Sequence, residues 1–206
     1  MSETMLRWLT TAVRDRRGFT MVEQLAAVAV AVTAAAAIIP ATLMTITSHQ
    51  FKTNAHGVTN YLAVAKMKSA ADFTRSRLFV DLSTDSYHIE IWQRTGTPGW
   101  VFEGGAQNLS PGVRFGFGSL ATAPPDTQAT LAMAPPCLDD SGTPIANTAC
   151  IVFNSRGIPI DATGTASSGA LYLTNGVGVY GATLSANSRL QLWWTRAANA
   201  AWMRTQ

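Results

Sequence analysis

The sequence carries little charge. Only 13% of its 206 residues are Asp, Glu, Lys or Arg, against about 25% in a typical soluble protein. Residues 25–46 contain no charged residue at all. The net charge of +3 indicates a basic protein, but four of the fifteen basic residues and only two of the twelve acidic ones lie in residues 1–18. Residues 19–206 therefore carry a net charge of +1, which does not by itself favour a nucleic-acid-binding protein.

Residues suited to catalysis or metal binding are also scarce. The chain has three histidines, and neither a G-x-S-x-G nor an H-E-x-x-H motif occurs. Its two cysteines lack the four-ligand pattern of a zinc site. We therefore expect no enzyme, no cofactor and no metal centre. Asp139 and Asp140 offer two adjacent carboxylates that could bind a cation, and a hydrated loop is the alternative interpretation.

The two cysteines, Cys137 and Cys150, lie 13 positions apart in a stretch rich in Pro, Gly and Asp. In an exported protein they would form a disulfide, whose short loop is worth about 3 kcal/mol in the chain-entropy model. In a reducing cytoplasm they would be two separate thiols. The amino-terminal segment decides between these alternatives, and it favours export.

That segment is a long apolar run. Its uncharged part, 25–46, would be about 33 Å long as a helix, enough to cross a hydrocarbon core of about 30 Å. Arginines precede the run and none follows it directly, which predicts an amino terminus in the cytoplasm. We expect Pro40 to kink the helix. A cleaved secretory signal has a shorter apolar core, and a simple signal anchor leaves the acidic Glu23 without a role.

The residues around the start of the run carry a resemblance to a known family. Arg16-Arg17-Gly18-Phe19-Thr20-Met21-Val22-Glu23 resembles the class III signal of type IV pilins and type II secretion pseudopilins. The resemblance implies that a prepilin peptidase cuts after Gly18 and methylates the new amino terminus, Phe19. Glu23 is then the fifth mature residue, as in the family, and Pro40 the twenty-second, where pilins commonly have a proline.

The resemblance also implies a role for Glu23. Subunits of a pilus are staggered, so the carboxylate of one subunit can meet the positive amino terminus of its neighbour. An unpaired carboxylate in lipid costs several kcal/mol, so the pair favours assembly and sets its register. The alternative is an anchor-helix glutamate that snorkels to the membrane surface.

A helical pattern continues beyond the apolar run. We predict one helix from about Phe19 to about Ser76, whose second half packs on a globular head. Apolar residues near a 3.6-residue period form its expected buried stripe: Phe51, Ala55, Val58, Leu62, Ala65 and Ala70. Basic residues mostly off the stripe predict a solvated face: Lys52, Lys66, Lys68, Arg75 and Arg77.

From Phe79 onward, short β-like runs alternate with turn residues. Residues 86–105 predict a hairpin, and 112–118 predict a further strand. Residues 121–148 are rich in Ala, Pro, Thr and Asp and predict a long surface excursion, held by the Cys137–Cys150 disulfide. Four more strands are expected within 150–161, 169–176, 177–185 and 188–194. The fold class is therefore α+β, a long helix packed on an antiparallel, pilin-like head.

The carboxy-terminal half narrows the resemblance. "IVFNSRGIP", "GALYLTN" and "LSANSRLQLWW" are similar to the end of the GspH/FimT group of minor pilins. One branch of that group ends in a Gly-Arg-x-Arg turn implicated in DNA binding, whereas residues 187–191 hold a single arginine. The candidate DNA-binding residues are Arg189, Arg196 and Arg204, beside several tryptophans; the alternative is that these arginines only keep the surface soluble.

These patterns together predict four segments. We expect a leader at 1–18, a transmembrane and assembly helix at 19–46, the second half of the helix at 47–78, and a β-rich periplasmic head at 79–206. The expected function is that of a minor pilin or pseudopilin, anchored in the inner membrane and then incorporated into a fibre. Its expected partners are a prepilin peptidase and other pilin subunits. A type II secretion pseudopilin and a DNA-binding pilin for DNA uptake are the alternatives.

Overall fold

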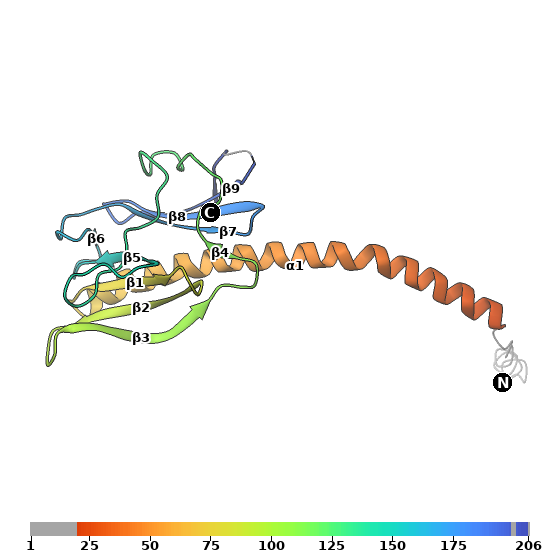
Figure 1. Ribbon diagram of the computed structural model, residues 1–206, viewed down its shortest axis with the longest axis horizontal. Helices are drawn as coiled ribbons and strands as arrows, with labels where there is room; N and C mark the ends of the chain where they lie inside the picture. Colours follow the sequence, from red (N-terminus) through yellow and green to blue (C-terminus); the bar gives the residue numbers. More distant parts are fainter. Residues whose placement is uncertain (1–19, 199–200, 206) are drawn as a thin grey trace, which may run out of the picture. The chain divides into compact units, whose positions relative to one another are not determined.

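A computed structural model describes residues 20–198 and 201–205, without the side chains of 37–41 and 43. Its one described helix, α1, spans Met21–Ala71 (Figure 1). The chain divides within this helix into two compact units, Met1–Ile46 and Thr47–Gln206. Within the described part of the chain, no helical stretch combines the length and the apolar character that a bilayer crossing requires. The membrane span expected over 19–46 is not confirmed.

Helix α1 begins where the sequence places a capping residue. Thr20 precedes the first turn, and its Oγ1 accepts a hydrogen bond of 3.3 Å from the Glu23 N–H. The Thr20 carbonyl accepts another, of 3.1 Å, from the Gln24 N–H. Two of the amide groups near the start of the helix are thereby connected to Thr20, as in an N-terminal cap. The expected start near Phe19 is confirmed to within two residues.

The end of α1 differs from the expectation. The helix stops at Ala71, and Phe73 takes a left-handed backbone conformation with φ of 48°. The Thr74 N–H then bonds the Ser69 carbonyl at 3.2 Å, closing the last turn. A glycine normally takes this position, and its absence hid the helix end from the sequence pattern. Residues 76–78, expected in the helix, lie instead in strand β1 (Ser76–Asp81).

The buried face of the helix follows the expected period almost throughout. The first five residues of the stripe, at 51, 55, 58, 62 and 65, are all buried. The sixth, Ala70, is exposed, and Ser69 is buried in its place. The Ser69 hydroxyl can lie inside because it donates a 2.8 Å hydrogen bond to the Lys66 carbonyl.

The strands form two antiparallel sheets of five. The first has the order β3-β2-β1-β5-β6 and contains β2 (Ser86–Gln93), β3 (Gly99–Asn108), β5 (Thr148–Phe153) and β6 (Pro159–Ile160) beside β1. The second has the order β10-β9-β8-β7-β4, with β4 (Arg114–Phe115), β7 (Gly169–Thr174), β8 (Gly178–Leu184), β9 (Leu190–Arg196) and β10 (Met203–Thr205). The α+β class and the antiparallel pairing are confirmed.

Most of the expected strands are present, with some changes of length. The hairpin over 86–105 is β2–β3, extended to Asn108. The strand expected over 112–118 shrinks to the two residues of β4, because Gly112 and Gly116 on either side have φ of 82° and 137°. Strand β10 was not expected. It pairs with β9 and contains Arg204, one of the candidate DNA-binding residues.

One hydrophobic cluster joins the helix to both sheets. Val58 and Leu62 of α1 pack in it with residues from the first sheet, such as Leu78, and from the second, such as Leu171 and Leu173. A smaller cluster covers the other face of the second sheet. There Tyr172 and Val179 pack with Leu120, which directly precedes the 121–148 excursion, and with Trp202. Tyr172 donates a 2.8 Å hydrogen bond to Gln128 Oε1, so the excursion forms a layer over this sheet.

Three hairpin turns of the head share one design. In each, the side-chain oxygen of the first residue accepts hydrogen bonds from the backbone N–H groups two and four positions later. The fourth residue is a glycine with φ between 72° and 87°, which a type I turn with a following bulge requires. The turns are 139–143, 154–158 and 161–165.

The shared core predicts a large effect for one substitution. Leu62→Ala should lower the free energy of unfolding by about 3 kcal/mol, because it opens a cavity where the helix meets both sheets. Val64→Ala, two positions away and 36% exposed, is the control and should change it by less than about 0.5 kcal/mol. Urea unfolding followed by tryptophan fluorescence measures both, and equal effects would contradict the shared core.

Candidate functional site

The first turn of α1 places one carboxylate in an apolar segment. Glu23 is the sole charged residue of 19–46, and its side chain is exposed. Its backbone N–H is held by Thr20, as described above. Among the described residues, none forms an ion pair with its carboxylate.

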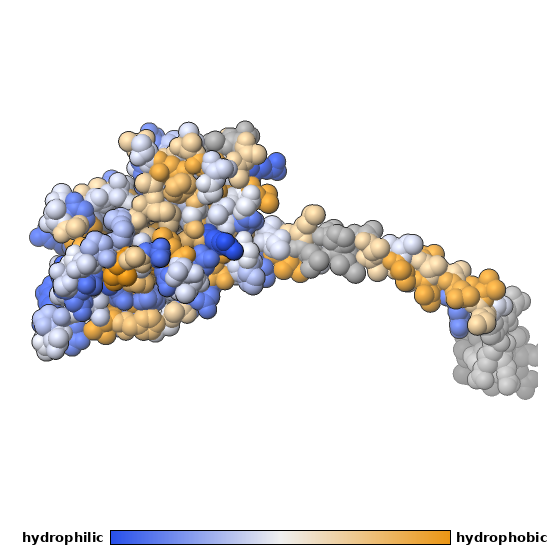
Figure 2. All heavy atoms as spheres, viewed as in Figure 1, coloured by the Kyte–Doolittle hydropathy of each residue, from blue (hydrophilic) through white to orange (hydrophobic). Residues whose placement is uncertain are grey.

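Apolar side chains surround this carboxylate on the helix. Met21, Leu25, Val28 and Val32 recur at the spacing of one helix face, and Val30 lies on the opposite face. Each is between 59% and 80% exposed. Figure 2 shows apolar residues along this described stretch of the helix. A helix that is apolar all round is typical of a segment that becomes buried, in a membrane or against other helices.

Three of the expected site residues lie beyond what the structure describes. Gly18 and Phe19, the expected cleavage and methylation sites, are outside the described residues. The side chain of Pro40 is also outside them, although the helix continues through position 40. Leader cleavage, methylation and the kink stay predictions.

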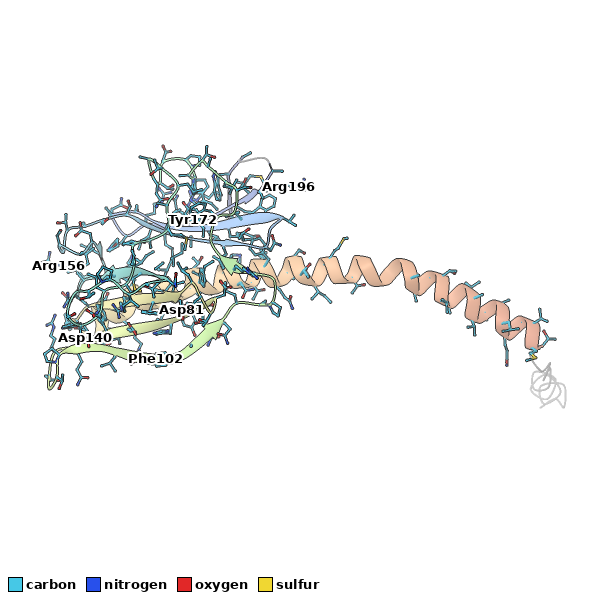
Figure 3. The ribbon with its side chains drawn as sticks, viewed as in Figure 1. Asp81, Phe102, Asp140, Arg156, Tyr172 and Arg196 are labelled. Atoms are coloured by element: carbon cyan, nitrogen blue, oxygen red, sulfur yellow. A yellow bond between two sulfur atoms is a disulfide. The ribbon has the colours of Figure 1, made fainter. Side chains whose placement is uncertain are left out.

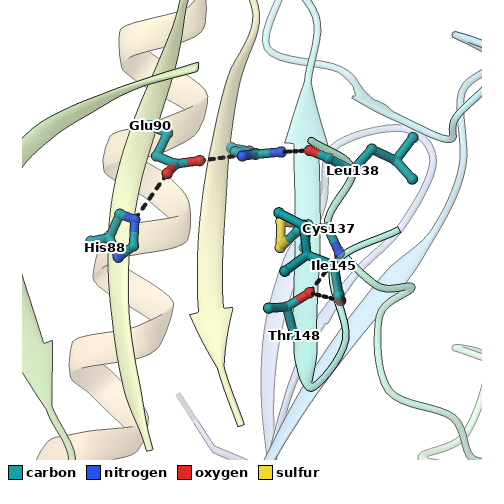
Figure 4. Close-up of a disulfide and its surroundings, with 8 residues drawn as sticks. His88, Glu90, Cys137, Leu138, Ile145 and Thr148 are labelled. Atoms are coloured by element: carbon teal, nitrogen blue, oxygen red, sulfur yellow. Dashed lines mark hydrogen bonds and ion pairs between the residues drawn. A yellow bond between two sulfur atoms is a disulfide. The ribbon is translucent and has the colours of Figure 1, made fainter. Parts of the chain in front are cut away.

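The disulfide expected in the head is present. Cys137 and Cys150 are joined, with their Cα atoms 4.9 Å apart. On either side, the Cys137 N–H donates to Thr148 Oγ1 at 3.0 Å, and the Cys150 N–H donates to the Pro135 carbonyl at 2.8 Å. The bond thereby attaches the end of the 121–148 excursion to β5 (Figure 4).

A buried ion pair beside the disulfide was not expected. Arg77 was predicted on a solvated helix face, but it lies in β1 with 3% of its surface exposed. It pairs with Glu90, directly opposite in β2, and donates a second hydrogen bond to the Leu138 carbonyl. His88 Nε2 lies 3.1 Å from the other Glu90 oxygen (Figure 4). The sequence pattern missed the pair because it extended the helix over position 77.

Burial and pairing act in opposite directions on these groups. Burial lowers the pKa of Arg77, against the attraction of Glu90. Burial alone would raise the pKa of Glu90. The hydrogen bond from His88 and the charge of Arg77 outweigh it, so the Glu90 pKa is lower than usual. A charged hydrogen-bond chain from His88 through Glu90 and Arg77 to the Leu138 carbonyl therefore connects the first sheet to the excursion.

A cleft of about 760 Å³ lies over the same face of the first sheet. Trp92, Trp100 and Val152 belong to its lining, together with the turns 139–143 and 161–165. The Arg75 guanidinium lies 4.5 Å from the centre of the Trp92 ring, and that of Arg77 lies 4.1 Å from Trp100. The tryptophan faces are thus already covered by arginines of the chain itself.

Asp139 and Asp140, the candidate cation site, lie in a turn that is held by hydrogen bonds to their carboxylates. Asp139 Oδ1 accepts bonds from the backbone of Ser141 and Thr143, and Asp140 Oδ1 accepts a 2.8 Å bond from the Trp100 N–H. Among the described residues, no group of three or more His, Cys, Asp or Glu side chains is placed to hold a metal ion. The carboxylates are used to shape and attach the turn.

The three candidate DNA-binding arginines are exposed but are not brought together. Arg196 ends β9, on the same face as Trp194, whereas Arg204 pairs with Trp193 and lies on the opposite face of the sheet. Arg189 precedes β9, about 23 Å along the strand direction from Arg196 at about 3.3 Å per residue. The second sheet therefore separates the basic residues that a single DNA-binding patch would need.

Known proteins similar to this chain are found among solved structures. No family model and no curated protein matches this chain. Among solved structures, the chain is similar to the minor pseudopilin EpsH from the type 2 secretion system of Vibrio cholerae. The two are 12% identical, the match covers 69% of this chain and 95% of that chain, and the TM-score is 0.45. A similarity of this size defines neither a function nor the GspH/FimT group, so both depend on the residues of this chain.

The buried pair predicts a pH-dependent stability. Because the folded-state pKa of Glu90 is lowered, its stabilisation is present above the usual Glu pKa of about 4.3 and is lost as the pH falls through the lower folded value. Glu90→Gln should lower the free energy of unfolding at pH 7 by about 3 kcal/mol, because Arg77 is left buried and unpaired. Below about pH 5 the variant should also lose stability less steeply than the parent.

Glu103→Gln is the matched control. Glu103 pairs with Lys68, but both side chains are about two-fifths exposed, at 42% and 38%. An exposed pair is worth at most about 1 kcal/mol, so this variant should stay close to the parent at every pH. Urea unfolding between pH 2 and 8 compares the three proteins. Parallel curves for Glu90→Gln and the parent would refute the role given to the pair.

Proposed function

We propose that this chain is a structural subunit of a pilin-like fibre, a minor pilin or pseudopilin that assembles through the first half of α1. The observation that carries the proposal is the exposed carboxylate of Glu23, in the capped first turn of a helix that is otherwise uncharged and apolar over 21–46. Exposed apolar side chains on all sides of that helix require a partner. The chain acts in this proposal as a building block and as the substrate of a peptidase.

The partner of Glu23 is the amino terminus of a neighbouring subunit. Cleavage after Gly18 would leave Phe19 as the first residue, with a positive amine four positions before Glu23. Two such helices, staggered by about one turn, bring the amine of one to the carboxylate of the other. Each charge alone would be costly in an apolar surrounding, and pairing offsets that cost only in this register.

Before assembly, the proposed location of the chain is the inner membrane, with 25–46 in the apolar layer and the head in the periplasm. Two observations on the chain support this location. The basic residues of 1–18 precede the apolar run, as expected for a cytoplasmic leader. The disulfide in the head suits an oxidising compartment.

The proposal covers a type IV pilus and a type II secretion pseudopilus, because the helix chemistry that supports it is common to both in the family that the sequence resembles. It does not include DNA uptake. The separation of Arg189, Arg196 and Arg204 over two faces and two ends of a sheet favours the view that they keep the surface soluble.

Leader cleavage gives the first test. Gly18→Leu should abolish removal of residues 1–18 when the chain is produced with a prepilin peptidase, because a bulky side chain then occupies the position before the cut. Intact-mass spectrometry of the membrane fraction distinguishes the full chain from one that begins at a methylated Phe19. Asp15→Asn, within the leader but away from the cut, is the control and should be processed normally. A methylated Phe19 terminus in Gly18→Leu would exclude the proposed processing.

Glu23 gives the second test. Glu23→Gln keeps the size of the side chain and removes its charge, so the neighbour's amine is left buried without a counter-charge. We expect normal processing but at least a tenfold loss of association between tagged and untagged copies, since about 1.4 kcal/mol corresponds to a factor of ten. Gln24→Ala, the adjacent polar position, is the control. Equal association of Glu23→Gln and the parent would remove Glu23 from the assembly site.

A further inference from the structure

A second groove in the head has an apolar floor and a basic rim. Its volume is about 390 Å³, and its residues come from the start of the head part of α1, the turn before β8, and the end of β9. Phe51, Tyr180 and Trp194 supply the aromatic floor. The rim contains Lys52 and Arg196, with His49 beside them.

The rim cations have no ion-pair partner among the described residues of the head. The residues lining the groove include no Asp or Glu. The side chains of Lys52 and Arg196 form no ion pair or hydrogen bond with any residue in the described part of the chain. Val177, which also lines the groove, is 74% exposed. Two positive charges at the rim of an aromatic floor make this groove a site for a group that is negatively charged and partly apolar.

A suitable group is present on the head itself, at its other end. The turn 139–143 carries Asp139 and Asp140 and no basic residue. Figure 3 shows Asp140 and Arg196 at opposite ends of the head. The turn is rigid before any contact, since Asp139 bonds Ser141 and Thr143 and the disulfide lies two residues away at Cys137.

The carboxylate of Asp139 remains ionised over a wide pH range. The hydrogen bond from the Ser141 hydroxyl, together with backbone N–H donors from Thr143 and Ser141, lowers its pKa. One carboxylate oxygen of Asp139 is used in these bonds, and Asp140 uses one for the Trp100 N–H. Among the described residues, no hydrogen-bond donor contacts the second oxygen of either carboxylate, so this oxygen can accept from a cation of another subunit.

We propose that the groove of one head receives the turn 139–143 of a second copy, with Asp140 facing Arg196 and Asp139 facing Lys52. The two surfaces differ and lie at opposite ends, so the contact is head-to-tail and each bound copy presents a free groove or turn to the next. Such a contact extends into an open chain rather than closing into a dimer. This deepens the proposed function, because it adds a contact between heads to the contact between helices.

Cysteine cross-linking of the full chain in membranes tests the contact. Pro144→Cys, at an exposed position directly after the turn, and Val177→Cys, at the groove, are introduced into one chain, whose native cysteines are bonded to each other. Oxidation should give a ladder of dimers, trimers and longer species that a reductant removes. Each single-cysteine protein should give dimers at most. Ala106→Cys with Val177→Cys, which places the first cysteine on exposed β3, should give no ladder.

Charge exchange tests the residue pairing within the same experiment. Arg196→Glu should reduce the ladder at least fivefold, and so should Asp140→Lys. Combining the two should recover most of it, because the pair is rebuilt with reversed signs. Arg204→Glu makes the same charge change on the opposite face of the sheet and should leave the ladder intact. Asp140→Asn removes the charge but still accepts the hydrogen bond of the Trp100 N–H. This variant shows whether the smaller ladder of Asp140→Lys reflects only a disordered turn.

The outcomes separate this inference from the proposed function. Leader removal and association that depends on Glu23 are measured in the same membranes. If both are normal while the ladder is absent, stops at dimers, or is not recovered by the double exchange, the head-to-tail contact is wrong and the fibre proposal stands. If leader removal and Glu23-dependent association are absent, the fibre proposal fails regardless of the ladder. A recovered ladder with normal processing supports both.

Discussion

The head depends on one buried helix stripe. Phe51, Ala55, Val58, Leu62 and Ala65 lie in the same cluster as inward residues of both sheets, and the two sheets share no hydrogen-bonded strands. The helix therefore packs against both sheets in one core, and the sheets also meet directly where Gly169 of β7 lies against Ile151 of β5. Two alanines in the stripe have fully buried side chains, which leaves room for the larger residues of the strands to approach the helix.

The second constraint is the attachment of the long excursion. Residues between β4 and β5 contain almost no regular structure, so their position depends on particular bonds. The Cys137–Cys150 disulfide holds one end, and the Arg77 guanidinium bonds the Leu138 carbonyl next to it. Tyr172 and Trp202 hold the other part, through Gln128 and the Thr122 carbonyl. These bonds place the acidic turn 139–143 at a defined site on the head.

The two halves of α1 are both rich in apolar residues, but they differ in which faces are buried. In the head, apolar side chains on one face are buried by the sheets, and polar ones occupy the other face. Over 21–36 the apolar side chains are exposed on every face, and a single carboxylate interrupts them. Such a segment is stable only when lipid or other helices cover it. Because Glu23 is charged, the favourable partners are those that place a cation next to its carboxylate. Stability of the head and the proposed assembly of a fibre are thus separated along one helix.

The sequence alone determined the features that depend on local pattern. The helix start followed from the beginning of the apolar run, and the buried stripe from the 3.6-residue period. The β2–β3 hairpin followed from alternation, and the disulfide from the combination of two cysteines with an export-like leader. These features need only neighbouring residues, or a single covalent rule, to be inferred. The candidate site at Glu23 was likewise visible as one charge in an uncharged run.

Only the tertiary structure decided the features that depend on pairing across the chain. The helix ends before Phe73, which takes a left-handed conformation without being a glycine, so the sequence pattern did not indicate the end. Arg77 therefore lies in a strand, in a buried ion pair with Glu90, and not on a solvated helix face. The tertiary structure added β10 and placed Arg196 and Arg204 on opposite faces of a sheet, since a one-residue change in strand register reverses the direction of a side chain. It also brought Lys52 and Arg196, 144 positions apart, to one groove, and neither residue type nor spacing could have indicated that meeting.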